Sequence, residues 1–299
     1  MEYFVDARED RHLDPGTRVG LRGNFVALSD GVTHHELTGP AGGDIVVLTG
    51  GITVPLFYWD DTAAVLHENG FRTLTYSAYG RGYSDRVRGR YDEDLFVRQL
   101  SELLEAVGAP TPHHVVGASM GALVGMEYAR RTPAAVRSLA LVGPAGLSPR
   151  PPLQRLMSLS DAMTGLIARR LGRRVFDSHQ GRNITEPATA ARLQAMVTDA
   201  YRYEGSLYAF FETLQHFPLF DRASLYGAVA SLDIPTALMW GTEDLVTPID
   251  ALDRVRDLLA PDELHVVDNC GHMVPFERPT LVAETITSFI ATRTKPVHP

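Results

Sequence analysis

The sequence predicts an α/β fold in which helices flank a mostly parallel sheet and one helical segment interrupts the series. From about residue 20, short apolar runs alternate with longer segments of helical period, as expected for buried parallel strands joined by helices. The alternation stops after Val142 and resumes at Pro235. The 299 residues, 44% hydrophobic and 21% charged, are sufficient for a sizeable core.

Eight apolar runs are the expected strands. The first two flank Ser29-Asp30-Gly31, which is typical of a hairpin turn, and the others stand alone between helical segments. The expected strands are residues 24–28, 32–37, 45–48, 71–76, 114–116, 138–142, 236–240 and 264–267. The expected helices are residues 62–69, 94–107, 120–131, 248–259 and 279–292.

The segment between the two parts of the series is mostly helical by pattern and contains no clear strand. It begins at Ser148-Pro149-Arg150-Pro151-Pro152, a sequence that breaks regular structure. We therefore expect one core domain, residues 20–147 and 224–295, and a helical cap inserted at residues 148–223. A cap placed in this way interrupts a single core domain and does not form a second domain in tandem.

Composition excludes several functional classes. The net charge of −8 disfavours a nucleic-acid partner, and a single cysteine, Cys270, excludes disulfide scaffolds and cysteine-based zinc clusters. Apolar runs are too short for a membrane span, and the acidic start does not resemble a signal peptide. We expect a cytoplasmic protein, a monomer or homodimer, that acts on a small molecule without a metal or cofactor.

The candidate nucleophile is Ser119. Residues 117–121 read Gly-Ala-Ser-Met-Gly, which fits the G-x-S-x-G pattern between an expected strand and an expected helix. A serine on such a turn exposes its hydroxyl at the carboxyl edge of the sheet, where open α/β sheets bind ligands. The pattern therefore predicts nucleophilic catalysis.

A serine hydroxyl needs a base, and the base needs an orienting acid. His272 is the best candidate base, because it follows the expected strand at residues 264–267. Asp244, after the strand at residues 236–240, is the best candidate acid, with Glu243 as its rival. We interpret the pairs His34–His35 and His113–His114 as solvent-exposed or strand-end residues.

At this point the sequence resembles the α/β-hydrolase fold superfamily over about residues 20–295. Its resemblance is greatest to the serine ester-hydrolase branch that includes monoacylglycerol-lipase-like proteins with a helical cap. Five strings support this resemblance: Leu48-Thr49-Gly50-Gly51, Gly80-Arg81-Gly82-Tyr83-Ser84-Asp85, residues 117–121, residues 240–244 and Gly271-His272. The strings are specific for the fold and only weakly specific for a substrate.

The resemblance implies that the backbone N–H groups of Gly51 and Met120 form an oxyanion hole. Glycine permits a close backbone approach, and the first residue of a helix has an unpaired N–H group. Two positions depart from the family. Thr49 stands where relatives usually carry histidine, and Ser77 stands where many carry aspartate.

Aromatic residues are concentrated in the expected cap, at residues 201–220. Their spacing suits one apolar helix face that packs on the core, and the same residues are candidates for lining a substrate pocket. Trp59, Tyr208 and Phe211 are the candidate substrate-binding residues. The two interpretations are compatible.

The main functional hypothesis is a serine hydrolase that cleaves a carboxylic ester or thioester of a fairly apolar small molecule through an acyl-enzyme. A C–C bond hydrolase or a tailoring enzyme of secondary metabolism with the same triad is the first alternative. The arginine-rich composition, with Lys295 as the one lysine, and the departures at Thr49 and Ser77 motivate it. A low-turnover ligand sensor on the same fold is the second alternative.

Overall fold

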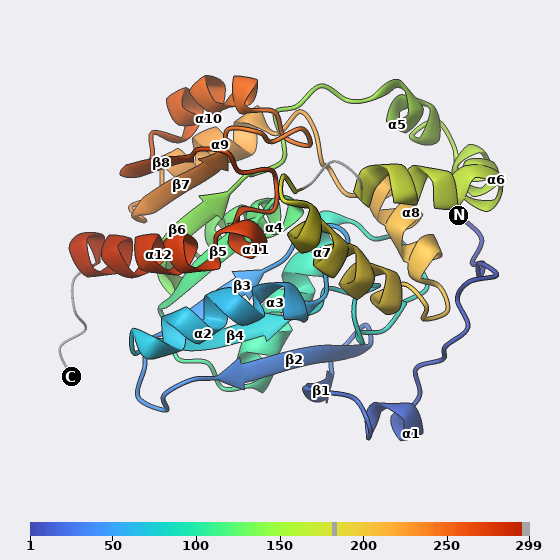
Figure 1. The fold of residues 1–299 in the computed structure, drawn as a ribbon, viewed down its shortest axis with the longest axis horizontal. Coiled ribbons are helices and arrows are strands. Elements are labelled where there is room, and N and C mark those ends of the chain that lie inside the picture. The colour runs from blue at the N-terminus through green and yellow to red at the C-terminus, as the bar shows by residue number, and fades with distance from the viewer. Residues whose placement is uncertain (181–183, 295–299) are drawn as a thin grey trace.

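The centre of the molecule is an eight-stranded sheet (Figure 1). The computed structural model describes residues 1–180 and 184–294. The strand order is β1-β2-β4-β3-β5-β6-β7-β8, with β1–β2 and β2–β4 antiparallel and the other pairs parallel. The predicted fold class is therefore confirmed.

The strands lie within about two residues of their predicted positions, as expected for boundaries set by fraying ends. Their bounds are β1 Asn24–Ala27, β2 Val32–Thr38, β3 Ile45–Thr49, β4 Arg72–Tyr76, β5 His113–Ala118, β6 Val136–Val142, β7 Thr236–Gly241 and β8 Glu263–Val267.

Two groups of helices cover the sheet. On one face, α2 packs against α12, and on the other α3, α4, α9 and α10 pack successively against one another. Their bounds are α2 Asp60–Glu68, α3 Glu93–Ala106, α4 Met120–Arg131, α9 Ala223–Ala230, α10 Leu252–Leu259 and α12 Pro279–Arg293. The structure adds two short segments beside the core, η1 Leu56–Trp59 and α11 Val274–Glu277, and two further turns of 3-10 helix, η2 Pro133–Ala135 and η3 Ile249–Ala251.

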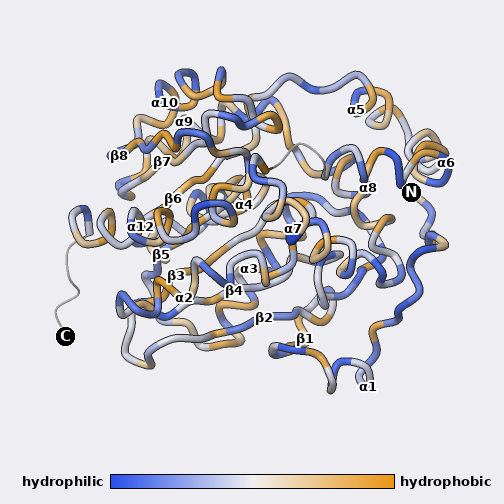
Figure 2. Tube along the Cα trace, in the orientation of Figure 1, coloured by the Kyte–Doolittle hydropathy of each residue, from blue (hydrophilic) through white to orange (hydrophobic). Residues whose placement is uncertain are grey.

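The central strands are buried on both faces. Every residue of β3, β5 and β7 is buried, whereas the edge strand β8 alternates between more and less exposed positions. Figure 2 shows hydrophobic residues along central strands such as β6. Continuous apolar runs predict such strands correctly because both faces are covered by helices.

The histidine pairs were predicted to be solvent-exposed or strand-end residues; solvent exposure is wrong for both pairs, whereas His113 and His114 do lie at a strand end, as the first two residues of β5. His34 and His35 on β2 and His113 and His114 on β5 are all buried. The burial of the first pair reflects the pairing of β2 with both β1 and β4, which a local sequence pattern does not reveal.

Helices fill the interruption between β6 and β7. They are α5 Pro152–Met157, α6 Asp161–Gln180, α7 Pro187–Ala200 and α8 Ser206–His216, followed by α9. Helix α6 packs against α5 and α8, whereas α9 packs against α4 and α10 of the sheet layer. These contacts support a cap that ends just before α9, and the division at residues 148–223 stays a prediction.

The N-terminal segment packs along α7 and α8, an arrangement that the sequence did not indicate. Arg11 forms an ion pair with Asp199 at 2.9 Å. The buried Glu9 carboxylate accepts hydrogen bonds from the N–H groups of Gly205 and Leu207, at the start of α8. The segment leads into the short helix α1 Pro15–Arg18 and lies beside α6 and α8 in Figure 1.

None of the helices within residues 1–180 and 184–294 is both long enough and apolar enough to cross a membrane.

Candidate active site

The candidate residues follow the carboxyl ends of four parallel strands of one sheet, β3, β5, β7 and β8. The order of strands reverses around β3, which has β4 on one side and β5 on the other. Open α/β sheets bind ligands at such a switch point. Gly51 follows β3 and Ser119 follows β5, so both residues flank it.

Ser119 occupies a strained turn between β5 and α4. Its φ of 54° and ψ of −117° are unusual for a residue with a side chain, and the conformation exposes the hydroxyl at the end of the strand. The Ser119 N–H group donates to the Val142 carbonyl at 3.0 Å. A Cβ atom on Gly121 would lie 2.3 Å from the Thr49 carbonyl oxygen, so only glycine permits α4 to begin this close to β3.

Asp244 and His272 form a buried pair. Their side chains are 0% and 2% exposed, and the His272 Nδ1–H group donates to Asp244 Oδ2 at 2.7 Å. The rival acid Glu243 has an exposed side chain. Because the carboxylate fixes Nδ1 as the protonated nitrogen, Nε2 carries the lone pair that a general base needs.

Thr247, which the sequence analysis missed, completes the surroundings of Asp244. The Thr247 hydroxyl donates to Asp244 Oδ2 at 2.8 Å, and the N–H groups of Val246 and Thr247 donate to Oδ1, each at 2.8 Å. An aspartate that accepts from backbone N–H groups two and three residues later forms a local turn. The sequence spacing Asp-x-x-Thr could therefore have indicated that Thr247 is a hydrogen-bond partner of Asp244.

A close backbone approach brings the Asp244 and His272 loops together. A Cβ atom on Gly241 would lie 2.3 Å from the Cys270 carbonyl oxygen and 2.4 Å from that of Gly271. The Glu243 N–H group also donates to the Cys270 carbonyl at 2.9 Å. The two loops are thus joined by backbone contacts, which position their side chains independently of any ligand.

The predicted oxyanion-hole residues lie next to Ser119. A Cβ atom on Gly51 would lie 3.5 Å from Ser119 Cβ and 3.9 Å from Ser119 Oγ. Met120 is the first residue of α4, where a helix leaves its N–H groups unpaired. The positions are compatible with an oxyanion hole, and this role stays a prediction.

Hydroxyl groups take part in the structure at both positions that depart from the family pattern. Thr49 Oγ1 donates to the Gly121 carbonyl at 2.8 Å and so connects β3 to the first turn of α4. Ser77 Oγ accepts from the Leu56 N–H group at 3.0 Å. These bonds connect segments close to Ser119, so Thr49 and Ser77 each stabilise the local structure with the residue that departs from the family pattern.

No hydrogen bond joins the Ser119 hydroxyl to His272 in the described part of the chain. Such bonds are often long in ligand-free enzymes and shorten when a substrate binds. The structure therefore brings Asp244 and His272 into contact and leaves Ser119 as a neighbour at the same sheet edge.

Ser119 lines a cavity of about 200 Å³ between the sheet edge and the inserted helices. We call it the Ser119 chamber; its other walls include Ile52, Met120, Ala145, Leu219 and Phe220. No aspartate, glutamate, lysine or arginine lines it within the described residues. The chamber therefore suits an uncharged, apolar group.

The three candidate substrate-binding aromatic residues are buried and lie outside the lining of the Ser119 chamber, so their role in binding stays a prediction. Trp59 and Phe211 are 0% exposed and Tyr208 is 2% exposed, and none of them lines the Ser119 chamber. The Tyr208 hydroxyl instead donates to the Gly89 carbonyl at 3.2 Å. Periodicity correctly identified an apolar helix face, but it did not distinguish packing from lining, and Phe220 lines the chamber from the same aromatic segment.

A serine on a strand-to-helix turn, near a histidine–aspartate pair on an eight-stranded sheet, is the arrangement of an α/β-hydrolase. The family model described as alpha/beta hydrolase fold matches residues 44–279. The chain belongs to this family.

Relatives in sequence include hydrolases of two kinds. The chain is 27% identical over 226 residues to the monoacylglycerol lipase ABHD6 of Mus musculus, covering 70% of this chain and 65% of the relative. It is 26% identical over 223 residues to a 2-hydroxymuconate semialdehyde hydrolase of Pseudomonas putida, covering 74% and 77% respectively. The chain thus spans about two thirds of the length of the lipase.

Solved structures confirm the fold. A thermophilic esterase from Thermogutta terrifontis has a TM-score of 0.77 and 19% identity, with 91% of this chain and 100% of that chain covered. An enol-lactonase from Burkholderia xenovorans has a TM-score of 0.75 and 20% identity, with 90% and 100% covered.

Proposed function

We propose that this protein is a serine hydrolase that cleaves uncharged carboxylic esters or thioesters through an acyl-enzyme. Ser119 is the nucleophile, His272 is the general base and acid, and Asp244 orients the imidazole ring and stabilises its charge. The N–H groups of Gly51 and Met120 stabilise the oxyanion.

One observation carries the proposal: the buried Asp244–His272 pair lies at the same sheet edge as the strained Ser119 turn. A structural histidine does not require a carboxylate partner at 2.7 Å beside a strained serine. Backbone strain of this kind is maintained at functional sites because the surrounding structure enforces it.

The reaction follows from these positions. Ser119 Oγ attacks the acyl carbon while His272 Nε2 takes the hydroxyl proton, which then passes to the leaving oxygen or sulfur. Water attacks the acyl-enzyme with His272 again as base, and the carboxylic acid leaves. The apolar Ser119 chamber excludes water from the acyl group, which strengthens the electrostatic contribution of the oxyanion donors.

A fluorophosphonate probe tests the nucleophile directly, because it labels only activated serines. We expect labelling of the wild-type protein, loss of labelling in Ser119→Ala, and normal labelling in Ser231→Ala, whose serine lies in an exposed position after α9. Persistent labelling of Ser119→Ala would refute the assignment.

C–C bond hydrolysis is the second candidate, supported by the similarity to the semialdehyde hydrolase. It uses the same nucleophile and base on a ketone. Since no charged side chain lines the Ser119 chamber within the described residues, esters of neutral acids are favoured over substrates that carry a carboxylate. Comparing the turnover of neutral esters with that of an acidic dienone distinguishes the two candidates.

The sensor alternative makes a different prediction. A sensor binds its ligand with a large thermal shift and shows negligible steady-state hydrolysis, whereas the proposed hydrolase turns over a panel of p-nitrophenyl esters. Measured turnover of the panel excludes the sensor.

A further inference from the structure

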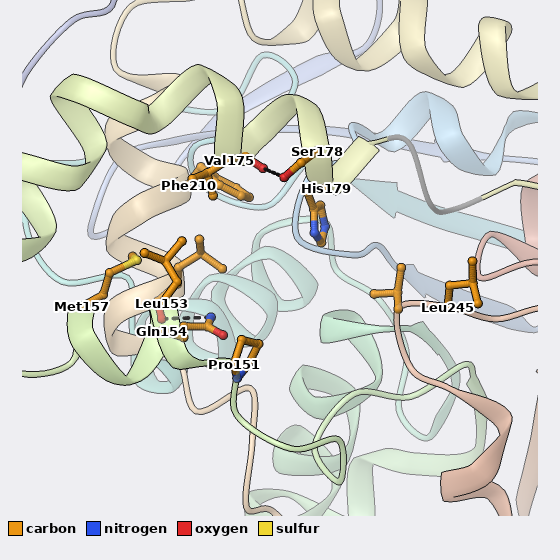
Figure 3. Close-up of a pocket in the computed structure, with 11 residues that line it drawn as sticks. Pro151, Leu153, Gln154, Met157, Val175, Ser178, His179, Phe210 and Leu245 are labelled. Atoms are coloured by element: carbon orange, nitrogen blue, oxygen red, sulfur yellow. Dashed lines mark hydrogen bonds between the residues drawn. The ribbon is translucent and has the colours of Figure 1, made fainter.

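Parts of the inserted helices lie close to the Asp244–His272 pair. A cavity of about 350 Å³ lies beneath these helices, and Figure 3 shows His179 of α6 and Leu245, the residue after Asp244, in its walls. His179 is also near enough to His272 to interact with it electrostatically. A contact that fixes the inserted helices relative to the His272 loop therefore bears on the proposed base.

Glu277, at the end of α11, makes such a contact. It is buried, and its carboxylate accepts hydrogen bonds from two segments. Oε1 accepts from the N–H group of Gly271, which directly precedes His272, at 2.8 Å. Oε2 accepts from the N–H group of Thr185 at 3.0 Å and from its hydroxyl at 2.6 Å, two residues before α7 begins. One carboxylate thus joins the His272 loop to the inserted helices.

The peptide group between Cys270 and Gly271 is bonded at both of its polar atoms. Its carbonyl oxygen accepts from the Glu243 N–H group at 2.9 Å, and its N–H group donates to Glu277. Because a peptide group is planar, two bonds on its opposite sides fix its orientation. The direction in which the chain enters His272 is therefore set by Glu243 on one side and by Glu277 on the other.

The Glu277 carboxylate is held by neutral donors. No lysine, arginine or histidine forms an ion pair with it among residues 1–180 and 184–294. A buried carboxylate is costly unless it is hydrogen-bonded, and bonds to an ionised acceptor are stronger than neutral ones. Burial and, next, the Glu277 charge raise the pKa of the Cys270 thiol to about 12, so a neutral thiol lies beside the carboxylate. Packing alone does not require a carboxylate here, whereas the donors on Gly271 and Thr185 use both of its oxygens.

Helix α7 contacts α11 at a second point. The Arg192 guanidinium of α7 lies over the Phe276 ring of α11, 4.3 Å from the ring centroid. Arg192 also forms an ion pair with Asp61 of α2 at 2.9 Å. Figure 1 shows the beginning of α7 beside α11. The bonds between Thr185 and Glu277 are therefore part of a wider contact between the inserted helices and the segment after the His272 loop.

We propose that Glu277 is a positioning residue for His272, and that its bonds to Thr185 make the placement of this base depend on the inserted helices. The inference rests on the proposed function, in which His272 is the general base. Glu277 lines neither the Ser119 chamber nor the cavity of Figure 3, so it acts through the Gly271 peptide group and not through substrate.

A positioning role predicts a loss of turnover with little change in substrate binding. Without Glu277, the Gly271 N–H group loses its acceptor, and the His272 loop is no longer fixed from this side. A misplacement of about 1 Å in a catalytic group can lower a rate by about 100-fold. Because Glu277 does not line the Ser119 chamber, KM should stay within about threefold of the wild-type value.

Glu277→Leu, Glu277→Gln and the control Glu284→Leu test this role with p-nitrophenyl hexanoate as substrate. We expect Glu277→Leu to lower kcat by about 10-fold to 100-fold, because a leucine side chain accepts no hydrogen bond. Glu277→Gln, whose amide oxygen still accepts from Gly271, should stay within about fivefold of the wild-type kcat. Glu284 lies at an exposed position on α12, so Glu284→Leu should leave kcat unchanged.

A proton NMR resonance reports the geometry of the base without any substrate. The Nδ1–H group of His272 donates to Asp244 at 2.7 Å, and a short charge-assisted bond of this kind shifts its proton far downfield. His272→Gln identifies the resonance by its loss. We expect the resonance to shift or broaden in Glu277→Leu and to keep its wild-type position in Glu277→Gln and Glu284→Leu.

The dependence on the inserted helices is tested at Thr185. Thr185→Val removes the hydroxyl donor to Glu277 and keeps the N–H donor, so it should lower kcat about threefold to fivefold. Thr185→Ser should retain the wild-type kcat. Because the hydroxyl acts through Glu277, Thr185→Val should cause no further loss in the Glu277→Leu background. Losses that multiply in the double variant overturn the coupling.

Three results overturn the positioning role. If folded Glu277→Leu keeps the wild-type kcat and His272 resonance and only its Tm falls, Glu277 is structural. If Glu277→Gln is as impaired as Glu277→Leu, hydrogen-bond acceptance is not the function of this side chain. If KM rises and kcat is unchanged, Glu277 shapes the substrate site.

The same experiments separate failure of this inference from failure of the proposed function. If circular dichroism shows that Glu277→Leu does not fold, Thr185→Val takes its place, and an unchanged kcat in Thr185→Val overturns the proposal. If the wild-type protein hydrolyses no ester and fluorophosphonate does not label Ser119, the proposed function fails. The His272 resonance still tests whether Glu277 positions the ring in that case.

Discussion

His34 on β2 and His272 after β8 are both buried, and in each ring Nδ1 contacts a side-chain oxygen. In His34 the partner is the Ser77 hydroxyl at 3.1 Å, and in His272 it is the Asp244 carboxylate at 2.7 Å. The hydrogen bonding of the other ring nitrogen, Nε2, differs more between the two histidines. His34 Nε2 donates to the Arg22 carbonyl at 2.8 Å, whereas no hydrogen bond to His272 Nε2 occurs among the described residues.

This difference separates a structural histidine from a candidate catalytic one. Because a carbonyl oxygen only accepts, Nε2 of His34 carries the proton, and Nδ1 accepts from the Ser77 hydroxyl. Both nitrogens are then satisfied, and the ring is neutral. In His272 the carboxylate holds the Nδ1–H group, and Nε2 has no hydrogen bond among the described residues, so this ring is oriented to accept a proton from Ser119.

The largest predicted effect is the loss of kcat when His272 is replaced, compared with a small change when His34 is replaced. His272→Gln should lower kcat by about 10⁵-fold to 10⁶-fold, because the base is lost. His34→Gln should reduce stability and leave kcat of the folded protein within about tenfold, because His34 contacts no reacting group. Steady-state kinetics on a p-nitrophenyl ester, with circular dichroism to establish folding, checks both. Equal losses in the two variants would contradict the distinction.

Asp244→Asn removes the carboxylate that makes the two histidines differ. We expect kcat to fall by about 10⁴-fold, because an amide does not hold the same tautomer or stabilise the charged ring. The matched variant is Glu243→Gln, whose exposed side chain should leave kcat unchanged. A comparable loss in Glu243→Gln would identify the rival as the acid.

Acid should destabilise the fold through His34. Burial lowers the pKa of His34 from its ordinary value of 6.5 to about 3. Between these values the unfolded chain binds the additional proton, so the stability is fully present above pH 6.5 and is lost as the pH falls toward 3. The slope from this group is about 1.4 kcal/mol per pH unit at most.

Urea unfolding at several pH values measures this slope. His34→Gln should show a shallower pH dependence than the wild-type protein. An identical pH dependence in the two proteins would show that His34 is not responsible.

The smallest effect is expected at Thr247, which orients Asp244 and does not contact substrate. Thr247→Val removes the hydroxyl donor to Asp244 Oδ2 and should lower kcat about fivefold to tenfold with little change in KM. Thr247→Ser, which keeps a hydroxyl group, should retain most of the wild-type activity. The apparent pKa in the pH profile of kcat should shift in Thr247→Val and stay unchanged in Thr247→Ser. No recovery in Thr247→Ser would indicate a packing role.

The fold was largely predictable because its signals are local. The apolar runs, the helical periods and the interruption after Val142 all reflect residues that are close in sequence. The strand order was not predicted, because register and neighbours depend on contacts between distant segments. The burial of His34 and His114 was missed for the same reason.

The sequence by itself identified Ser119, Asp244 and His272 as candidates, because each stands in a short motif directly after an expected strand, and parallel strands end at one edge. Only the tertiary structure decided which acid contacts the histidine, which side chains line the Ser119 chamber, and that His179 from the inserted helices lies near His272. The physical reason is that motifs depend on local backbone geometry, whereas the walls of a cavity come from segments whose packing no local pattern specifies.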